Sequence, residues 1–255
     1  MFTSGAAPGR RYPETVAERT GTVDPQRRAV IRQGLSVAIA TSLYGVSFGA
    51  LSVASGFTIW QTCVISLLLF SGGSQFALIG VLGAGGGIGS AIAASSLLGV
   101  RNTLYGLQLT TTLKPRGLMR IPTAQMTIDE STAVSVAQES LPHRRLGFWV
   151  TGVGIYLGWN VMTLVGALAG NAIGDPKTYG LDAAASAAFL ALLWPRLHRR
   201  EPVAVAIAAA FVAAILVPVA PVGIPVIAAA LVAVAFGLFR RLGDGDSAAP
   251  TGDLT

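Results

Sequence analysis

Residues 58–83 read TIWQTCVISLLLFSGGSQFALIGVLG, an apolar stretch interrupted in its middle by the run Ser71-Gly72-Gly73-Ser74-Gln75. Without the interruption, the stretch is long enough to cross a hydrocarbon layer of ~30 Å as one helix. A glycine pair weakens a helix, and irregular backbone at membrane depth persists only where protein or a cavity supplies hydrogen-bond partners. The segment therefore predicts a membrane helix that is broken or re-entrant. The alternative is an unbroken helix whose glycines permit close packing and whose glutamine bonds a neighbouring helix.

The chain on both sides of this stretch is also strongly apolar. Of its 255 residues, 52% are hydrophobic and 12% are charged, whereas soluble domains carry about 25% charged residues. The apolar stretches are dense in Ala, Gly, Ser and Thr, which suits close packing between membrane helices and not barrel strands. The sequence thus predicts an all-α fold, a polytopic integral membrane helical bundle with about 6–8 spans, one of them broken or re-entrant. The candidate spans are residues 34–56, 58–83, 87–113, 146–174, 180–194, 202–217 and 223–239.

Short clusters of basic residues separate the apolar stretches. A net charge of +6 does not indicate a nucleic-acid partner here, because the positive-inside rule places such clusters on the cytoplasmic side of membrane spans. If all clusters are cytoplasmic, each interval between two of them contains an even number of crossings. Residues 34–113 show three apolar stretches, so this parity holds only if residues 58–83 are not a simple span. The clusters are Arg27, Arg28 and Arg32; Lys114, Arg116 and Arg120; Arg144 and Arg145; Arg196, Arg199 and Arg200; and Arg240 and Arg241.

The two ends of the chain are polar and carry proline, glycine and mixed charges. Such segments bury too little apolar surface to fold on their own. We therefore expect disordered cytoplasmic tails at residues 1–33 and 242–255, which flank a transmembrane transport domain at residues 34–241. Both termini are then on the cytoplasmic side, and the lipid bilayer surrounds the domain.

Arg101 lies inside the apolar stretch 87–113, with Asn102 and Tyr105 within about one helical turn. A charge near the centre of a membrane helix costs about 3 kcal/mol on insertion scales, so it needs a partner, a cavity or a function. The planar guanidinium could bind a carboxylate through two hydrogen bonds. An internal ion pair to an acidic residue of another helix explains the charge equally well.

Asp129 and Glu130 are adjacent acids in the moderately apolar segment 123–138, which predicts a short interfacial or re-entrant helix instead of a full crossing. Either acid could bind an amino group, carry a proton or pair with Arg101. Further along the chain, Asn160 in the span 146–174 offers hydrogen bonds to other helices and is a candidate site residue. The adjacent tryptophan is expected in the core or in a pocket wall.

No enzyme class fits the motifs. The run Gly45-Val46-Ser47-Phe48-Gly49 matches the G-x-S-x-G nucleophile elbow. However, His143 and His198 lie in Arg-rich connectors outside the apolar spans, so the serine lacks a base. The sequence contains no P-loop and no His, Cys or carboxylate cluster with metal-ligand spacing. We therefore expect no catalytic residues, no metal and no cofactor.

Several motifs resemble those of the AzlC-type branched-chain amino acid permeases, the large subunits of branched-chain amino acid exporters. The likeness covers residues 34–239, and the chain departs from it by keeping only Phe48-Gly49 of a Pro-Phe-Gly and by having Gly99 and Asn102 around Arg101 in place of Asn and His. The matching motifs are Ser71-Gly72-Gly73-Ser74-Gln75-Phe76-Ala77, similar to (A/S)GxxQFA; Arg101-Asn102-Thr103-Leu104-Tyr105-Gly106, similar to N-L-R-H-x-L-Y-S; Thr127-Ile128-Asp129-Glu130-Ser131-Thr132-Ala133, similar to (T/L)DE(T/S)-x-A; Gly158-Trp159; Gly180-Leu181-Asp182; and Pro195.

This resemblance implies a secondary transporter subunit in the bacterial cytoplasmic membrane that exports valine, leucine or isoleucine together with a small hydrophobic AzlD-type membrane subunit. We hypothesise a midplane site in which the amides of the glycine pair or Arg101 receive the substrate carboxylate, and Asp129 or Glu130 receives the amino group or a coupled proton. The alternatives are transport of another neutral amino acid or a small organic anion, and a non-transporting membrane scaffold subunit. The predicted substrate-binding residues are Ser71, Gly72, Gly73, Ser74, Gln75, Arg101, Asn102, Tyr105 and Asn160.

Overall fold

Every regular element that the structure describes is helical, which confirms the predicted all-α class. Two of these helices, α1 (Pro25–Ala54) and α7 (Leu141–Ile173), are long and apolar enough to cross a membrane. Most of the predicted span 180–194 and its motif residues, together with Pro195, lie outside the described residues, so the number of crossings stays a prediction. The computed structural model describes residues 24–173, 190, 193–194 and 197–246.

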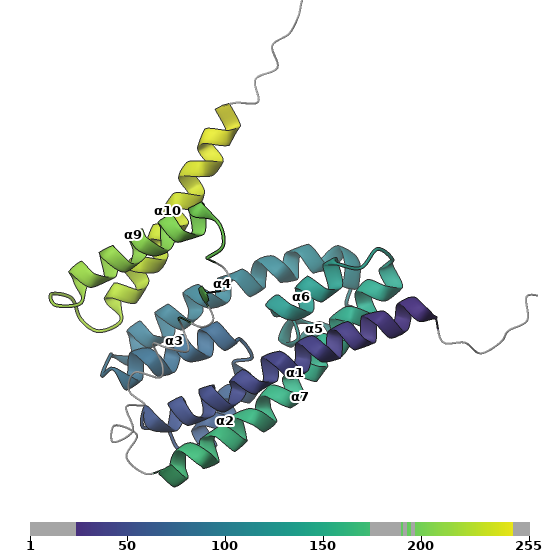
Figure 1. Cartoon of the computed structure of the whole chain (residues 1–255), viewed down its shortest axis with the longest axis horizontal. Coiled ribbons are helices and arrows are strands. Elements are labelled where there is room, and N and C mark those ends of the chain that lie inside the picture. Colours follow the sequence, from purple (N-terminus) through teal and green to yellow (C-terminus); the bar gives the residue numbers. More distant parts are fainter. Residues whose placement is uncertain (1–23, 174–189, 191–192, 195–196, 247–255) are drawn as a thin grey trace, which may run out of the picture.

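Helices α1 and α7 lie side by side and run in the same direction, purple beside green in Figure 1. Gly45 of α1 lies against the backbone of Trp159, and Gly49, one turn further on, lies against the backbone of Thr163. A side chain at either glycine would collide with the backbone of α7. The small residues therefore allow the close approach that membrane helices use for packing.

The ends of two helices correct the predicted tail boundaries. Helix α1 begins at Pro25 because the Asp24 side chain accepts a hydrogen bond from the Gln26 amide at 2.9 Å and proline suits the first helical position. The prediction of a disordered tail is therefore wrong for residues 25–33. Helix α10 (Ile224–Asp246) likewise runs past residue 242. Apolar content marks only part of a helix, whereas its caps lie in the polar sequence beyond.

The stretch 58–83 is broken, as the sequence predicted. It forms two short helices, α2 (Ile59–Leu68) and α3 (Gly72–Gly83). At ~1.5 Å per residue, each covers about half of a hydrocarbon layer ~30 Å thick.

Both outer ends of this α2–α3 pair lie beside the end of α1. Ser52 Oγ and Thr62 Oγ1 are 2.7 Å apart, and Gly83 packs against Ser55. The pair is therefore a re-entrant hairpin that enters and leaves at one end of the bundle. Such a hairpin does not pass from one end of the bundle to the other, which is the arrangement that the parity argument predicts for residues 58–83.

A second hairpin follows α4 (Ile88–Leu113). It consists of the 3₁₀ turn η1 (Gly117–Met119), α5 (Arg120–Gln125) and α6 (Asp129–Val136). The sequence predicted one short helix in residues 123–138. The structure has α6 within this segment, and residues 123–125 form the end of α5.

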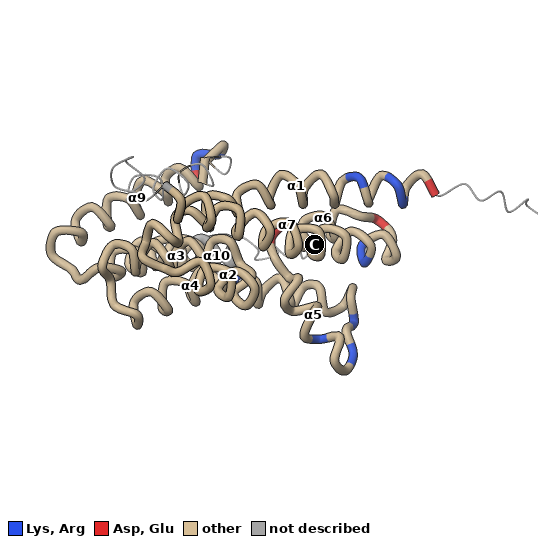
Figure 2. The backbone as a smooth tube through the Cα atoms, turned by 90° about the horizontal axis from the view of Figure 1, so that it is seen from below, with Lys and Arg blue, Asp and Glu red and all other residues tan. Residues whose placement is uncertain are grey.

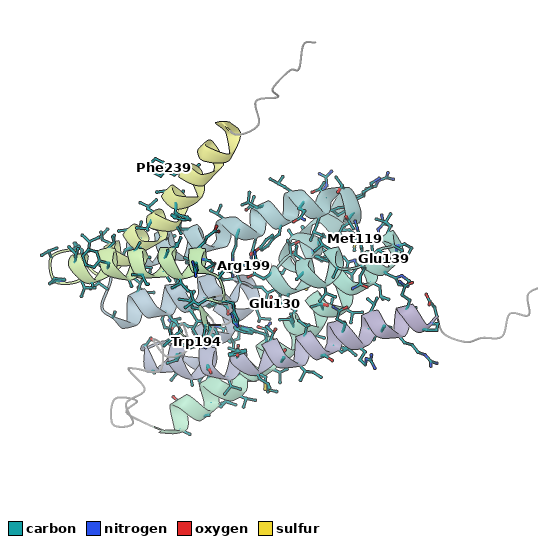
Figure 3. The ribbon with its side chains drawn as sticks, turned by 45° about the horizontal axis from the view of Figure 1, so that its top comes forward. Met119, Glu130, Glu139, Trp194, Arg199 and Phe239 are labelled. Atoms are coloured by element: carbon teal, nitrogen blue, oxygen red, sulfur yellow. The ribbon has the colours of Figure 1, made fainter. Side chains whose placement is uncertain are left out.

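The α5–α6 hairpin enters from the opposite end of the bundle. At its tip, Gln125 Nε2 donates a hydrogen bond to the Leu67 carbonyl oxygen at 2.9 Å, at the inner end of α2. At its outer end, Gln138 Nε2 donates to Gln33 Oε1 at 3.1 Å, near the start of α1. Figure 3 shows Glu130 within the bundle and Glu139 at its end. The tips of the two hairpins therefore meet inside the bundle.

Helices α9 (Arg200–Leu216) and α10 form a further hairpin beside α3 and α4. Ser90 Oγ donates a hydrogen bond to the Val222 carbonyl oxygen at 3.2 Å, which fixes the start of α10 against α4. Beyond that contact α10 leaves the bundle, as Figure 1 shows.

Lysine and arginine gather at the end of the bundle where α1 and α7 begin (Figure 2). The cluster at Arg27 and Arg28 opens α1, and Arg145 Nε donates a hydrogen bond to the Thr112 carbonyl oxygen, 3.1 Å away at the end of α4. Three predicted basic clusters thus share one side, as the positive-inside rule requires of cytoplasmic clusters.

Candidate functional site

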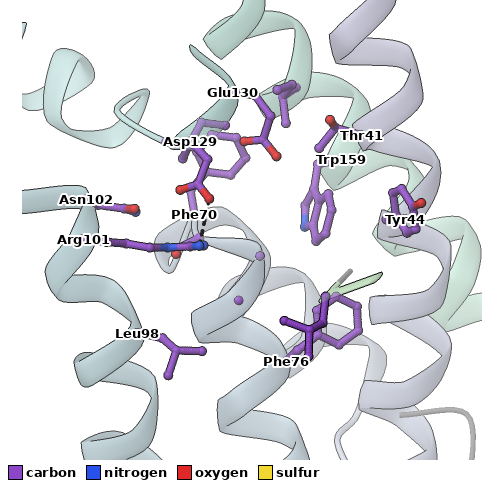
Figure 4. A pocket seen from close by; sticks show the side chains of 16 residues that line it. Thr41, Tyr44, Phe70, Phe76, Leu98, Arg101, Asn102, Asp129, Glu130 and Trp159 are labelled. Atoms are coloured by element: carbon purple, nitrogen blue, oxygen red, sulfur yellow. Dashed lines mark ion pairs between the residues drawn. The ribbon is translucent and has the colours of Figure 1, made fainter. Parts of the chain in front are cut away.

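A cavity of about 300 Å³ lies where the two hairpin tips meet. Figure 4 shows Arg101 and Asn102 on one side of it and Trp159, Thr41 and Tyr44 on the other. The cavity is large enough for a small molecule and lies at the lower limit of typical ligand pockets. The residues that line it are Thr41, Tyr44, Phe70, Ser71, Gly72, Gly73, Phe76, Leu98, Arg101, Asn102, Ile128, Asp129, Glu130, Ile155, Trp159 and Leu193.

Aromatic rings form one wall of the cavity. The Trp159 ring stacks on Phe48 with centroids 6.3 Å apart and meets Phe76 edge to face at 6.5 Å. Trp159 and Phe76 are buried and Phe48 is fully enclosed, so the cluster is rigid. This wall offers a ligand apolar contact area and no charge.

The opposite wall holds the charged residues. Arg101 Nη1 of α4 lies 2.8 Å from Asp129 Oδ2, the first residue of α6, so this ion pair joins α4 to the second hairpin. The pair is partly accessible, with 33% of the Arg101 side chain and 18% of the Asp129 side chain exposed. The bond uses one guanidinium nitrogen, and Arg101 Nε has no hydrogen-bond partner in the described structure.

Helix α3 begins at the cavity with its positive end. Ser71 precedes it in extended conformation and makes no capping hydrogen bond with its side chain, although its Oγ is buried. The first N–H groups of a helix have no partner within the helix, so the amides of Gly72 and Gly73 can bind an anionic group.

Among the described residues, charges of both signs line the cavity. Arg101 contributes one positive charge and the start of α3 about half of one, against the two carboxylates of Asp129 and Glu130. The start of α6 adds a further partial positive charge of about the same size. Such a site suits a zwitterion better than an ion of one sign.

Gln75 lies behind the cavity wall and fixes the break between α2 and α3. Its Nε2 donates to the Leu69 carbonyl oxygen at 2.7 Å and to that of Ser66 at 3.4 Å, while its Oε1 accepts from Trp159 Nε1 at 3.0 Å. The carbonyls at the end of a helix lack partners within it. Gln75 therefore satisfies them at membrane depth and holds the tryptophan in place.

Seven of the residues named from the sequence line the cavity, and four do not. Ser74 is buried beside Gly99, Gln75 forms the network above, and Asn160 Nδ2 donates to the Tyr156 carbonyl oxygen at 2.7 Å within its own helix. Tyr105 is half-buried on α4 away from the cavity. The residues brought together are Ser71, Gly72, Gly73, Arg101, Asn102, Asp129 and Glu130.

Most of the apolar lining could not be named from the sequence. Trp159 was expected in a core or a pocket wall, and it is both. Nothing in the sequence singles out Thr41, Tyr44 or Ile155. Ile39 on α1, for example, is of the same type as Ile155 but faces the outside of the bundle. Within the described residues, no three His, Cys, Asp or Glu side chains gather in a way that could hold a metal ion.

Comparison with known proteins gives a family and a relative. A family model described as AzlC protein matches residues 36–173, which run from α1 to the end of α7 and include both hairpins. A protein of Archaeoglobus fulgidus named "Uncharacterized membrane protein" is 35% identical over 183 residues, which cover 69% of this chain and 80% of the relative. No solved structure matches. The chain belongs to the AzlC family, and with its apolar helices it is a membrane protein.

Proposed function

We propose that this AzlC-family chain is the large subunit of a secondary transporter that exports valine, leucine and isoleucine across the bacterial cytoplasmic membrane. It acts with a small hydrophobic AzlD-type membrane subunit, uses no cofactor, catalyses no reaction and has both termini in the cytoplasm. The observation that supports this best is the cavity between two hairpins that enter from opposite ends, with charged groups on one wall and aromatic rings on the other. Discontinuous helices that meet near the midplane form the substrate sites of many secondary transporters.

The substrate carboxylate binds between Arg101 and the start of α3. Arg101 Nη1 is engaged by Asp129, whereas Nε has no partner and Nη2 lies beside Gly73. Nε and Nη2 form the edge of the guanidinium whose two parallel N–H groups a carboxylate accepts in a bidentate manner, and Nε is buried at this edge. Gly72 and Gly73, whose amides belong to the start of α3, line the cavity beside Arg101 and add donors for the same carboxylate.

The substrate amino group binds the carboxylate of Glu130, which lines the cavity from the tip of the second hairpin. Figure 4 shows Glu130 between Asp129 and Trp159, across the cavity from Phe76. An amino acid whose amino group binds Glu130 places its carboxylate at Arg101 and its side chain against the aromatic wall. The amino group of a zwitterion offers Glu130 a positively charged ligand group and a small organic anion does not, so the proposal favours a zwitterion.

Binding also links the substrate to the movement of the second hairpin. A substrate carboxylate on the Nε and Nη2 edge competes with Asp129, which holds Nη1, for the positive charge of Arg101 and so weakens the ion pair that joins α4 to α6. A ligand shifts a conformational equilibrium when it interacts differently with the two states. Release of Asp129 from Arg101 provides such a difference.

The test is efflux of labelled valine, leucine and isoleucine from cells that express the chain with and without its small partner. Arg101→Gln should reduce efflux at least tenfold, because it removes the charge-assisted hydrogen bonds to the carboxylate. Arg116→Gln, which changes an exposed arginine of a basic cluster, is the matched control and should leave efflux unchanged.

Two results would contradict the proposal. Absence of efflux of all three amino acids, with both subunits present in the membrane, would leave the fold intact and refute the substrate. Efflux that persists in Arg101→Gln would show that the carboxylate binds elsewhere.

A further inference from the structure

Two adjacent glycines in the first turn of α3 face different walls of the cavity. A Cβ atom at Gly73 would lie 3.2 Å from Arg101 Nη2, the proposed carboxylate side. A Cβ atom at Gly72 would lie 3.4 Å from the Trp159 ring carbon Cη2, the aromatic side. One turn of helix therefore touches both the polar and the apolar part of the site.

The two positions also differ in what an added methyl group would displace. At Gly72 the methyl group would make ordinary van der Waals contact with Trp159, so it fits without moving the protein. It would, however, occupy space in the cavity that a ligand could otherwise use. At Gly73 the contact with Nη2 is tighter, and the guanidinium would have to shift by a few tenths of an ångström.

Trp159 cannot yield to a larger ligand. Its Nε1 donates to Gln75 Oε1 at 3.0 Å, and its ring is held between Phe48 and Phe76. A tryptophan that is hydrogen-bonded and packed in this way presents a surface of fixed position. The distance between this surface and the start of α3 is therefore fixed as well.

We propose that Gly72 and Trp159 set the largest side chain that the transporter accepts, whereas Gly73 serves the binding of the group shared by all amino acids. This inference rests on the proposed function, because it assumes that the cavity binds an amino acid with its carboxylate at Arg101. Gln75 is the positioning residue that keeps Trp159 in place.

The test compares Gly72→Ala with its neighbour Gly73→Ala in the purified full chain with its small partner, in lipid nanodiscs. Both glycines have negative φ angles, so alanine fits the helix. Affinities for alanine, valine, leucine and phenylalanine are measured by competition with labelled leucine, and thermal unfolding checks that both variants are folded. Gly72→Ala should weaken leucine binding roughly tenfold or more and alanine binding little, because one methylene in an apolar pocket is worth about that factor. Gly73→Ala should weaken all four by the same factor.

The outcomes distinguish a failure of this inference from a failure of the proposed function. A size-dependent loss in Gly72→Ala, with a uniform loss in Gly73→Ala, supports the assignment. An equal loss for all ligands in Gly72→Ala, or no loss, overturns it and leaves the proposed function in place. If the wild-type protein binds none of the four amino acids, the proposed function fails and this inference fails with it.

Discussion

The two re-entrant hairpins reach the same cavity from opposite ends but contribute different chemistry. The tip of the α2–α3 hairpin offers backbone amides at Gly72 and Gly73 and no charged side chain. The tip of the α5–α6 hairpin offers two carboxylates, Asp129 and Glu130. One hairpin therefore provides partial charges from its backbone, and the other provides full charges from its side chains.

The hairpins also differ in how they are held. The break in the first is bonded to the rest of the bundle by Gln75 and by Tyr156, whose hydroxyl donates to the Leu67 carbonyl oxygen at 3.3 Å. The tip of the second is joined to α4 by the Arg101–Asp129 pair. A substrate carboxylate can replace the second kind of contact but not the first. Under the proposed function, we therefore expect the α2–α3 hairpin to act as a fixed wall and the α5–α6 hairpin to respond to substrate.

Gln75→Leu should have the largest effect on stability. The substitution leaves the Trp159 indole N–H buried without a partner, which costs about 1–3 kcal/mol. It also removes the Gln75 hydrogen bond to the Leu69 carbonyl, which keeps its bond from the Ser71 amide, and the loss of such a bond costs about 1 kcal/mol. We expect a total loss of roughly 2–4 kcal/mol, seen as a lower unfolding temperature in detergent, together with loss of transport.

Gln61→Leu is the control for this variant, because Gln61 is an exposed residue at the outer end of the same hairpin. It should cost about 1 kcal/mol or less, as expected for a helix cap. If both glutamine variants had the same small effect, the first hairpin would not be the fixed wall that the comparison describes.

Asp129→Asn should have an intermediate effect on stability and should change substrate affinity and efflux in different ways. Arg101 loses its ionised partner at a partly buried site, which costs roughly 1–3 kcal/mol, between the values for exposed and buried pairs. At the same time the carboxylate that competes with substrate is removed. We expect leucine to bind at least as tightly as in the wild type, while efflux falls at least tenfold.

Glu139→Gln, at the exposed outer end of the hairpin, should change neither the affinity for leucine nor the efflux rate. Equal losses of affinity and of rate in Asp129→Asn would show that Asp129 contributes to the substrate site in the ground state. The second hairpin would then be as fixed as the first.

The sequence predicted the charged and irregular parts of the site better than its apolar parts. An arginine at membrane depth and two adjacent acids are rare in membrane segments, and a glycine pair weakens a helix, so each is informative by itself. The break at residues 69–71, directly before the glycine pair, and the cavity positions of Arg101 and Asp129 follow from such local signals. The sequence left open whether Arg101 binds substrate or pairs with an acid, and the structure shows that it pairs with Asp129.

The apolar wall could not be predicted, because its residues do not differ in type from those that face outward. Ile155 lines the cavity while Leu157, two residues further along α7, is 61% exposed. Which of them faces the cavity depends on how α7 is rotated against α1, and this rotation follows from backbone contacts such as that of Gly45 with Trp159. These contacts join residues more than a hundred positions apart. Gln75 was predicted to bind substrate but lies behind the cavity wall. The sequence does not show which helix its amide group faces.

Gln125→Ala should have the smallest effect on stability and is the most direct test of how far the two hairpins depend on each other. Gln125 Nε2 joins the tips by its hydrogen bond to the Leu67 carbonyl oxygen, and such bonds between membrane helices contribute about 0.6 kcal/mol on average. Tyr156 donates to the same carbonyl, so that group stays bonded in the variant. We expect a small change in unfolding temperature and a change in efflux rate of about twofold to threefold, the factor that 0.6 kcal/mol represents.

Gln138→Ala, at the outer end of the same hairpin, should match it in stability but leave efflux unchanged, since that end is far from the cavity. A stability loss in Gln125→Ala as large as that of Gln75→Leu would mean that the two tips form one rigid unit, and the distinction between a fixed and a responsive hairpin would then be wrong.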